Sequence, residues 1–165
     1  MKPIKCLVIS DTHGRVDALR NAVRRQPSVD AIIFLGDGLS DLEDILPEIS
    51  PSTTVLAVKG NCDFGGEYLS HKIFKVDSIT LADKKIVFTH GDLYGVKYGM
   101  DGIIRLAGQM SADIILYGHT HVASEEYIDG VYYLNPGSLA GGFNSATCGV
   151  LTLTDKGVLF SLMEL

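Results

Sequence analysis

Short apolar runs alternate with amphipathic segments in the N-terminal part of the chain. Residues 5–10, 31–35 and 54–58 are apolar runs of strand length. Residues 16–26 place apolar side chains on one helical face and arginines on the other. A second helix is predicted after residue 38, and its inward positions are Leu42, Ile45, Leu46 and Ile49. The order strand, helix, strand, helix, strand predicts parallel strands joined by helical crossovers.

The pattern changes in the second half of the chain, where strand pairs dominate. Residues 73–81 and 84–89 predict two strands joined at Ala82-Asp83, and residues 100–110 predict a helix. Further strands are predicted at residues 113–117, 125–128, 131–134, 150–154 and 158–162. Asp129-Gly130 and Asp155-Lys156-Gly157 are typical hairpin turns. Because no internal repeat or linker interrupts this pattern, we expect one mixed α/β domain over residues 1–165.

The composition favours a chain that folds without disulfides. Its 165 residues are enough to bury roughly two thirds of the unfolded surface in one core. Cys6, Cys62 and Cys148 lie far apart and form no Cys-x-x-Cys pair, which favours a reducing compartment. No segment has a signal-peptide core or the ~20 apolar residues of a membrane span. We therefore expect a soluble, cytoplasmic protein with no membrane partner.

The formal net charge of −6 narrows the range of partners. Binding to duplex nucleic acid requires lysines and arginines concentrated on one face of a protein, and the basic residues of this chain form no such cluster. We therefore expect no duplex nucleic acid partner. A phosphate held by metal ions is compatible with this charge.

Glycines and potential metal ligands follow five of the predicted strands. The segments are SDTHG at 10–14, GDG at 36–38, GNCD at 60–63, HGD at 90–92 and GHTH at 118–121. Ligands of open α/β sheets bind outside the carboxyl ends of the strands, so these distant side chains can meet there. Four of the five histidines lie in these segments.

Each of these residues taken alone has another explanation. Asp11 and Asp37 could be helix N-caps or turn residues. His119 and His121 converge on one point if strand geometry persists through GHTH, and otherwise form a turn with two solvated imidazoles. Together, the candidates are too many for one tetrahedral site and include no thiolate, so they predict a two-metal centre with ions about 3.5–4 Å apart. The seven candidate metal ligands are Asp11, His13, Asp37, Asn61, His90, His119 and His121.

The ordered motifs DTH, GD, GNCD, HG and GHTH, followed by NPGS at 135–138, resemble those of the calcineurin-like metallophosphoesterases, of the small bacterial and archaeal phosphodiesterase type. The resemblance covers essentially the whole chain. It implies a four-layer α/β/β/α sandwich, with two mixed sheets flanked by helices and the metals at one end. It also implies the ligand sets: Asp11, His13 and His121 for one ion, Asn61, His90 and His119 for the other, and Asp37 as the bridge.

The resemblance further implies hydrolysis of a small phosphoester by a hydroxide that bridges two divalent ions. Asp37, Asn61 and His90 are then the expected catalytic residues. Imidazole and carboxylate ligands suit Mn, Fe, Co, Ni or Zn, and cellular availability favours Mn or Fe. We take Mn as the expected metal.

One position departs from the wider superfamily. Many of its phosphatases carry a histidine directly after the asparagine ligand, thought to protonate the leaving group, whereas this chain has Cys62, as the small bacterial members do. A thiol is a poor general acid at pH 7, so diesters and aryl esters are expected to react better than alkyl monoesters. We expect Cys62 to be a bystander thiol, and Asp63 to brace the loop or a ligand histidine.

The residues that face the substrate are less well defined by sequence. Arg15, Tyr94, Lys97 and Tyr98 follow the ligand motifs and either line the pocket or are solvated. After NPGS, relatives often have a basic residue, but this chain has LAGGF at 139–143, which indicates that fixed cationic recognition of a second phosphate is missing. The glycine-rich stretch through Ser145 is a candidate for a mobile flap.

Other functions are weaker fits. The segment 36–41 nearly matches a dinucleotide-binding fingerprint, but its third glycine is replaced by Asp41 and the next strand ends without an acidic residue. No phosphate loop and no Gly-x-Ser-x-Gly elbow occurs. The remaining alternative is a non-catalytic protein-binding scaffold on the same fold, like the phosphoesterase-like subunit of retromer. The retention of all seven candidate ligands favours the enzyme, and exposed strand edges favour a homodimer.

Overall fold

The first sheet extends on both sides of the N-terminal strand. A computed structural model describes residues 2–65 and 67–165. The strands of this sheet are β1 (Ile4–Ile9), β2 (Ala31–Phe34), β3 (Thr54–Ala57), β9 (Thr147–Thr154) and β10 (Gly157–Glu164), in the order β10-β9-β1-β2-β3. β1, β2 and β3 are parallel, as the alternating pattern predicts, and β9 pairs antiparallel with both β1 and β10.

The second sheet comes from the middle of the chain. Its strands are β4 (Val76–Leu81), β5 (Lys84–Thr89), β6 (Ile114–Tyr117), β7 (Ser124–Ile128) and β8 (Val131–Asn135), in the order β4-β5-β6-β8-β7. β5, β6 and β8 are parallel, and β4 and β7 are antiparallel edge strands. At the β4–β5 hairpin Ala82 and Asp83 both have positive φ, as two-residue turns of the mirror-image type require. The predicted turn there is confirmed.

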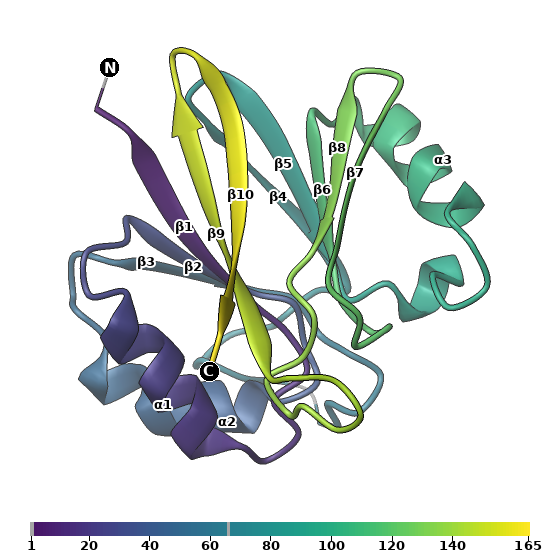
Figure 1. Cartoon of the computed structure of the whole chain (residues 1–165). Helices are drawn as coiled ribbons and strands as arrows, with labels where there is room; N and C mark the ends of the chain where they lie inside the picture. Colours follow the sequence, from purple (N-terminus) through teal and green to yellow (C-terminus); the bar gives the residue numbers. More distant parts are fainter. Residues whose placement is uncertain (1, 66) are drawn as a thin grey trace.

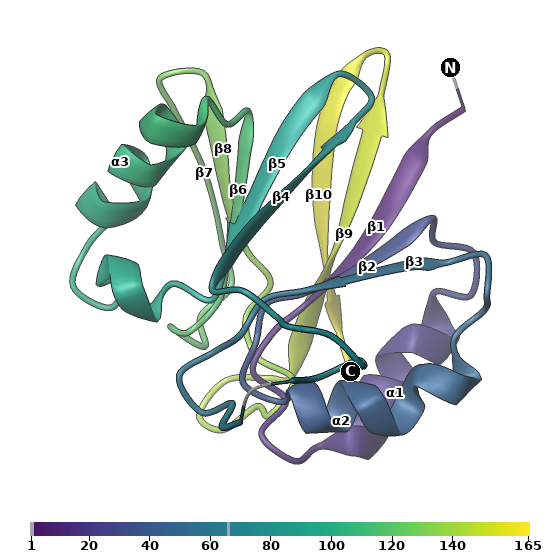
Figure 2. The same cartoon turned by 180° about the vertical axis from the view of Figure 1, so that it is seen from behind.

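The helices cover the outer faces of the two sheets (Figure 1). α1 (Val16–Arg25) and α2 (Leu39–Ile45), which continues into η1 (Leu46–Glu48), lie on the first sheet. α3 (Asp101–Met110) lies on the second sheet, and the short turn η2 (Asp92–Tyr94) precedes it. Figure 2 shows the same layers from behind. The predicted four-layer α/β/β/α sandwich is confirmed.

Alternation along the strands produces the layers. On β1, Leu7 and Ile9 pack toward α1 and α2, whereas Cys6 and Val8 pack toward the second sheet. All four side chains are fully buried. Since successive residues of a strand point to opposite faces, one apolar strand serves two cores. The two sheets therefore share a central core, and the carboxyl ends of their parallel strands come together at one end of the molecule (Figure 1).

The strand predicted at residues 73–81 is shorter than expected. β4 begins at Val76. Ile73 packs instead into the core beneath α1 and α2, and the Lys75 ammonium reaches back to the loop after β3. The apolar side chain of Ile73 is therefore buried in a connection between the sheets. In the described part of the chain, no helix has the length and hydrophobicity needed to cross a membrane.

Candidate metal centre

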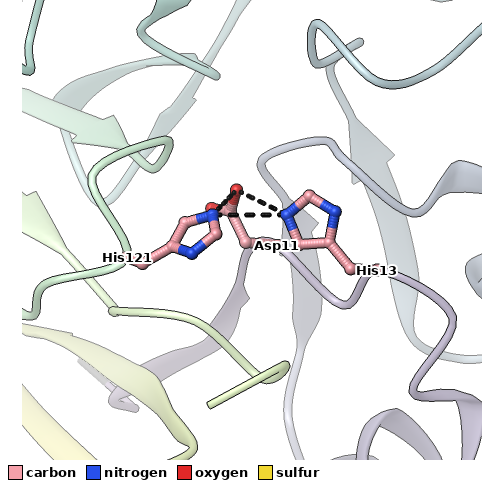
Figure 3. A group of neighbouring side chains, drawn as sticks. All are labelled: Asp11, His13 and His121. Atoms are coloured by element: carbon pink, nitrogen blue, oxygen red, sulfur yellow. Dashed lines mark hydrogen bonds and ion pairs between the residues drawn. The ribbon is translucent and has the colours of Figure 1, made fainter. Parts of the chain in front are cut away.

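Three predicted ligands form a first group at the end of β1 and the loop after β6 (Figure 3). His121 Nε2 lies 3.0 Å from Asp11 Oδ1, and His13 Nε2 lies 3.5 Å from the same oxygen. The two imidazole nitrogens are 3.2 Å apart. Three potential donor atoms thus face one point, two of them from the loop after β1 and the third from His121, 108 residues after His13.

A second group lies beside the first, at the ends of β2, β3, β5 and β6. His90 Nε2 lies 3.1 Å from Asn61 Oδ1, 3.1 Å from His119 Nδ1 and 3.3 Å from Asp37 Oδ2. Asp37, His90 and His119 are close enough to hold one metal ion. The structure therefore brings together all seven residues singled out in the sequence.

Asp37 stands between the two groups. Its Oδ2 is 3.3 Å from His90 Nε2 in the second group and 3.8 Å from His13 Nε2 in the first. Its Oδ1 accepts a hydrogen bond from the Cys62 backbone N–H at 2.7 Å. One carboxylate oxygen is thus anchored by the backbone, while the other faces both groups.

The backbone at the candidate ligands is strained. Asp11, His13, Asp37, His119 and His121 all have φ between 44° and 66°, the left-handed region that side chains other than glycine rarely adopt. Strand geometry therefore does not persist through GHTH, because β6 ends at Tyr117 and both histidines lie in the loop that follows. The alternative in which the two histidines converge on one point is therefore not observed: His121 belongs to the first group and His119 to the second, the division that the family resemblance implies.

The helix-capping alternative for the two aspartates is also wrong. The N-cap of α1 is Arg15 and that of α2 is Gly38, and neither makes a side-chain capping hydrogen bond. Asp11 and Asp37 instead point into the shared centre. Their buried positions, at 0% and 2% exposure, therefore need another source of stabilisation.

The chemistry of the converging atoms fits metal cations. Asp11 Oδ1 is buried and has no hydrogen-bond partner among the described residues. His90 Nδ1 is 2.8 Å from the Leu35 carbonyl and donates its hydrogen there, so the Nε2 of a neutral ring carries a lone pair. That lone pair faces the Asn61 and Asp37 oxygens, which are also acceptors. Converging lone pairs repel one another unless a cation lies between them, so the residues fit divalent metal ions.

The pKa values reflect this crowding. Burial alone would raise the pKa of Asp11, but His121 and His90 outweigh it and hold that pKa below its usual value. The pKa of Asp37 is also lowered, because the His90 ring and the Cys62 N–H outweigh burial. Conversely, the Asp11 carboxylate, 3.0 Å from His121 Nε2, raises the pKa of His121, and Asp37 and Asp11 together raise that of His90 despite its burial. Protons and a divalent cation therefore compete for the same nitrogen atoms.

Asp63 joins the loops that carry two candidate ligands. Its Oδ1 accepts from the backbone N–H groups of Gly38 and Leu39, at 2.9 Å each. Its Oδ2 accepts from the N–H groups of Asp37, at 2.8 Å, and Gly60, at 2.9 Å. The side chain is thus a brace between the loops after β2 and β3, which is one of the roles expected from the sequence.

The NPGS segment supports the remaining loops. Asn135 Nδ2 donates to the Gly118 carbonyl at 3.1 Å and to Thr120 Oγ1 at 2.9 Å, within GHTH. Ser138 Oγ donates to the Asp11 carbonyl at 2.9 Å. Both side chains are buried, and among the described residues neither forms a hydrogen bond with a candidate ligand side chain, so they act on the candidate ligands through the backbone and Thr120.

Comparison with known proteins identifies the family. The family model of the calcineurin-like phosphoesterase superfamily domain matches residues 4–156. The chain belongs to the calcineurin-like phosphoesterase superfamily. This confirms the resemblance recognised from the five motifs.

Relatives of this phosphoesterase include a probable metallophosphoesterase and a phosphodiesterase. The probable metallophosphoesterase YsnB of Bacillus subtilis is 37% identical over 134 residues, which cover 81% of this chain and 73% of the relative. The phosphodiesterase YfcE of Escherichia coli strain K12 is 28% identical over 169 residues, covering 90% and 87%. The structure of Vacuolar Protein Sorting 29 from Cryptosporidium parvum superimposes with a TM-score of 0.78 over 99% of this chain and 98% of that one, at 17% identity. That last likeness concerns the fold alone.

A cleft beside the first group has His13 and Asp37 in its wall, and none of the four candidate substrate-facing residues of this phosphoesterase lines it. The lining of that cleft includes neither Arg15 nor Tyr94, Lys97 or Tyr98, and Tyr98 is 96% exposed. The proposed flap is anchored at its start, because Leu139 is fully buried and the Ala140 N–H donates to the Asp11 carbonyl at 3.0 Å. The exposed part begins only after these contacts.

Asp41 and Lys75 support the phosphoesterase site, although the sequence predicted no such role for either of them. Buried Asp41 accepts hydrogen bonds from the Thr12 hydroxyl and, at 2.8 Å, from the Gly14 N–H, and so holds the loop that carries His13. Lys75 Nζ donates to the Gly60 carbonyl at 2.9 Å and to Asp92 Oδ2 at 3.0 Å. Its own carbonyl accepts from the Thr89 hydroxyl at 2.9 Å. Lys75 thus ties together the loops that carry Asn61 and His90, one from each sheet.

Replacing Lys75 with methionine is expected to weaken Mn²⁺ binding by about 10-fold, because groups that orient metal ligands typically contribute that much to affinity. Calorimetric titration of the metal-free protein with Mn²⁺ measures the change. Lys84→Met is the matched control: Lys84 pairs with Asp113 at 3.6 Å, at the other end of β5. Equal Mn²⁺ affinities for the two variants would contradict the positioning role.

Proposed function

We propose that the chain hydrolyses a small phosphodiester with the help of two divalent metal ions. Asp11, His13 and His121 would hold one ion, and Asn61, His90 and His119 the other. Asp37 would be shared. The observation that carries this proposal is the position of Asp37 Oδ2, 3.8 Å from His13 Nε2 and 3.3 Å from His90 Nε2.

Paired divalent cations, when bound, lower the pKa of water and offset the charge that develops on a phosphoryl group. Imidazole and carboxylate donors suit Mn, Fe, Co, Ni and Zn, and we favour Mn on cellular availability. Asp11 and Asp37 contribute two negative charges against four positive charges. The centre would therefore remain positive within an otherwise acidic chain and attract an anionic phosphoester.

The side chains of the centre would act mainly by preorganisation. His90 is fully buried and its ring orientation is set by the Leu35 carbonyl, so it cannot turn away when substrate binds. Asn61 is exposed, so a substrate would be able to reach its side chain. With Asp37 these are the residues to which we assign catalytic roles, since a donor set fixed before the reaction needs no reorganisation during it.

Cys62 supports a preference for diesters and aryl esters. Although Cys62 is exposed, partial desolvation and the neighbouring Asp37 and Asp63 raise the pKa of its thiol. The thiol therefore stays protonated and is a poor proton donor to an alkoxide leaving group. Substrates whose leaving groups need little protonation would react fastest.

Cys62→His is expected to raise kcat for an alkyl phosphomonoester by about 100-fold, the lower range for a positioned general acid. Activity on bis(4-nitrophenyl) phosphate, whose leaving group needs no proton, should change by less than about 3-fold. Cys62→Ser is the control, because it conserves size without supplying an acid. A histidine variant that gained nothing on the monoester would contradict the role assigned to this position.

The test of the two-metal proposal is a titration of the metal-free protein with Mn²⁺ while bis(4-nitrophenyl) phosphate hydrolysis is followed. We expect activity to saturate as the second equivalent of Mn²⁺ binds. Plasma spectroscopy of the loaded protein gives the stoichiometry independently. Full activity at one equivalent would overturn the dinuclear mechanism.

A protein-binding scaffold is the second candidate, favoured by the fold that the chain shares with Vacuolar Protein Sorting 29. A scaffold needs no metal donors, whereas all seven candidate donors are present here. The Mn²⁺ titration separates the two, since a scaffold would give no metal-dependent hydrolysis. A homodimer and a cytoplasmic location stay predictions from the sequence.

A further inference from the structure

A cleft of about 320 Å³ opens directly from the candidate metal centre. His13 and Asp37 form part of its wall, so a group bound there would lie next to the phosphorus atom of a substrate held by the metals. The size is near the lower end of small-molecule sites, which is about 300 Å³. A single organic substituent of a phosphoester would fill it.

The cleft has an aromatic wall. Phe64 and Tyr68 both line it, and the Phe64 side chain is 82% exposed. Because the Phe64 ring is exposed beside the candidate metal centre, a planar group of a bound ligand can stack on it. Such aromatic stacking stabilises binding without specific hydrogen bonds. This wall favours a planar, aromatic substituent.

The charge of the cleft excludes a second anion. Asp41 and Asp63 line it in addition to Asp37, and its described lining contains no lysine or arginine. Both extra carboxylates are buried and committed to hydrogen bonds with backbone N–H groups, so they are fixed features of the wall. A substituent with its own phosphate or carboxylate would meet like charge here.

The Ser40 hydroxyl and the Cys62 thiol add neutral polar groups to the lining. The Ser40 hydroxyl is exposed on the cleft and makes no hydrogen bond among the described residues. It can donate to or accept from a hydroxyl or amide of a bound group. Gly14 leaves the entrance open, since a Cβ at this position would meet nothing within 4 Å.

The geometry points to a substrate subsite: this cleft binds an uncharged aromatic substituent of the phosphoester, such as an aryl group or a nucleoside, stacked on Phe64. The inference rests on the proposed function and specifies its substrate class. It assigns Phe64 as a specificity-determining residue.

Phosphonates test the subsite without turnover. Calorimetry with the Mn²⁺-loaded protein should show phenylphosphonate binding about 10-fold more tightly than methylphosphonate, within the range of aromatic stacking. 4-Carboxyphenylphosphonate should bind about 10-fold more weakly than phenylphosphonate, because its added charge faces the carboxylates. In Phe64→Ala the preference for phenyl over methyl should fall below about 3-fold, while methylphosphonate affinity is unchanged.

Phe74→Ala is the matched control, since Phe74 is 56% exposed and does not line the cleft. It should retain the phenyl preference. Equal binding of phenyl- and methylphosphonate to the unmodified protein, or a preference that survives in Phe64→Ala, overturns the subsite alone. Failure of both phosphonates to bind the Mn²⁺-loaded protein overturns the proposed function as well.

Discussion

Replacing Asp37 with alanine is expected to lower kcat/KM for bis(4-nitrophenyl) phosphate by about 10³-fold or more, equivalent to about 4 kcal/mol of transition-state stabilisation. The Oδ2 atom of Asp37 faces both His13, at 3.8 Å, and His90, at 3.3 Å. Its removal would take away a shared ligand and one of two charges that balance the cations. Steady-state assays with Mn²⁺ measure the loss.

Asp44→Ala provides the control for this variant. Asp44 is an exposed carboxylate on α2, the helix that follows Asp37. We expect unchanged activity in the control, and fewer than two bound Mn²⁺ per chain in Asp37→Ala. A chelator should abolish the activity of the unmodified protein. If the chelator does not lower the rate of hydrolysis, or if Asp37→Ala retains activity, the phosphodiester is not cleaved by the proposed two-metal mechanism.

Much of the fold follows from the sequence because the same apolar residues that define the strands also define the layers. Leu7 and Ile9 on one face of β1, and Cys6 and Val8 on the other, are all apolar, which predicts a strand buried on both sides. The start of β4 could not be predicted in this way. Ile73 is as apolar as a strand residue, but it fills a core from a connection, and periodicity over three residues does not separate these cases.

The proximity of the seven candidate ligands could also be predicted, since each follows a strand whose carboxyl end lies at one edge. His119 and His121 belong to different groups because of the backbone conformation of the loop after β6, which the alternation of GHTH does not reveal. Only the resemblance to a known family implied this division. Sequence spacing therefore finds the donors, and backbone conformation decides which donors meet.

The supporting residues were harder to find. Lys75 lies in no motif, and its role depends on the Gly60 carbonyl and Asp92 meeting across two sheets. Asp41 lies beside acidic helix residues that the sequence places on the outer face. In the structure it is 5% exposed and accepts a hydrogen bond from the Gly14 N–H, in the loop that carries His13. Such contacts are long-range and leave no local pattern.

Asp63→Ala is expected to lower the free energy of unfolding by about 4 kcal/mol, because truncation leaves four backbone N–H groups without their acceptor in a buried setting. For a chain of this size the thermal midpoint should fall by about 10 °C. Chemical and thermal denaturation of the metal-free protein measure the loss without any contribution from bound ions. Mn²⁺ affinity should fall as well, since two of the four N–H groups belong to Asp37 and to Gly60, which precedes Asn61.

Asp63→Asn separates the hydrogen bonds from packing. The amide keeps one oxygen that can accept from two N–H groups, but its NH₂ faces the other two donors, so about half of the stability loss should persist. Asp113→Ala is the control: Asp113 accepts one backbone N–H, from Lys85 at 2.8 Å, and is 40% exposed. Its loss should cost less than about 1 kcal/mol. Equal effects of Asp63→Ala and Asp113→Ala would mean that the buried carboxylate does not hold the loops after β2 and β3 together.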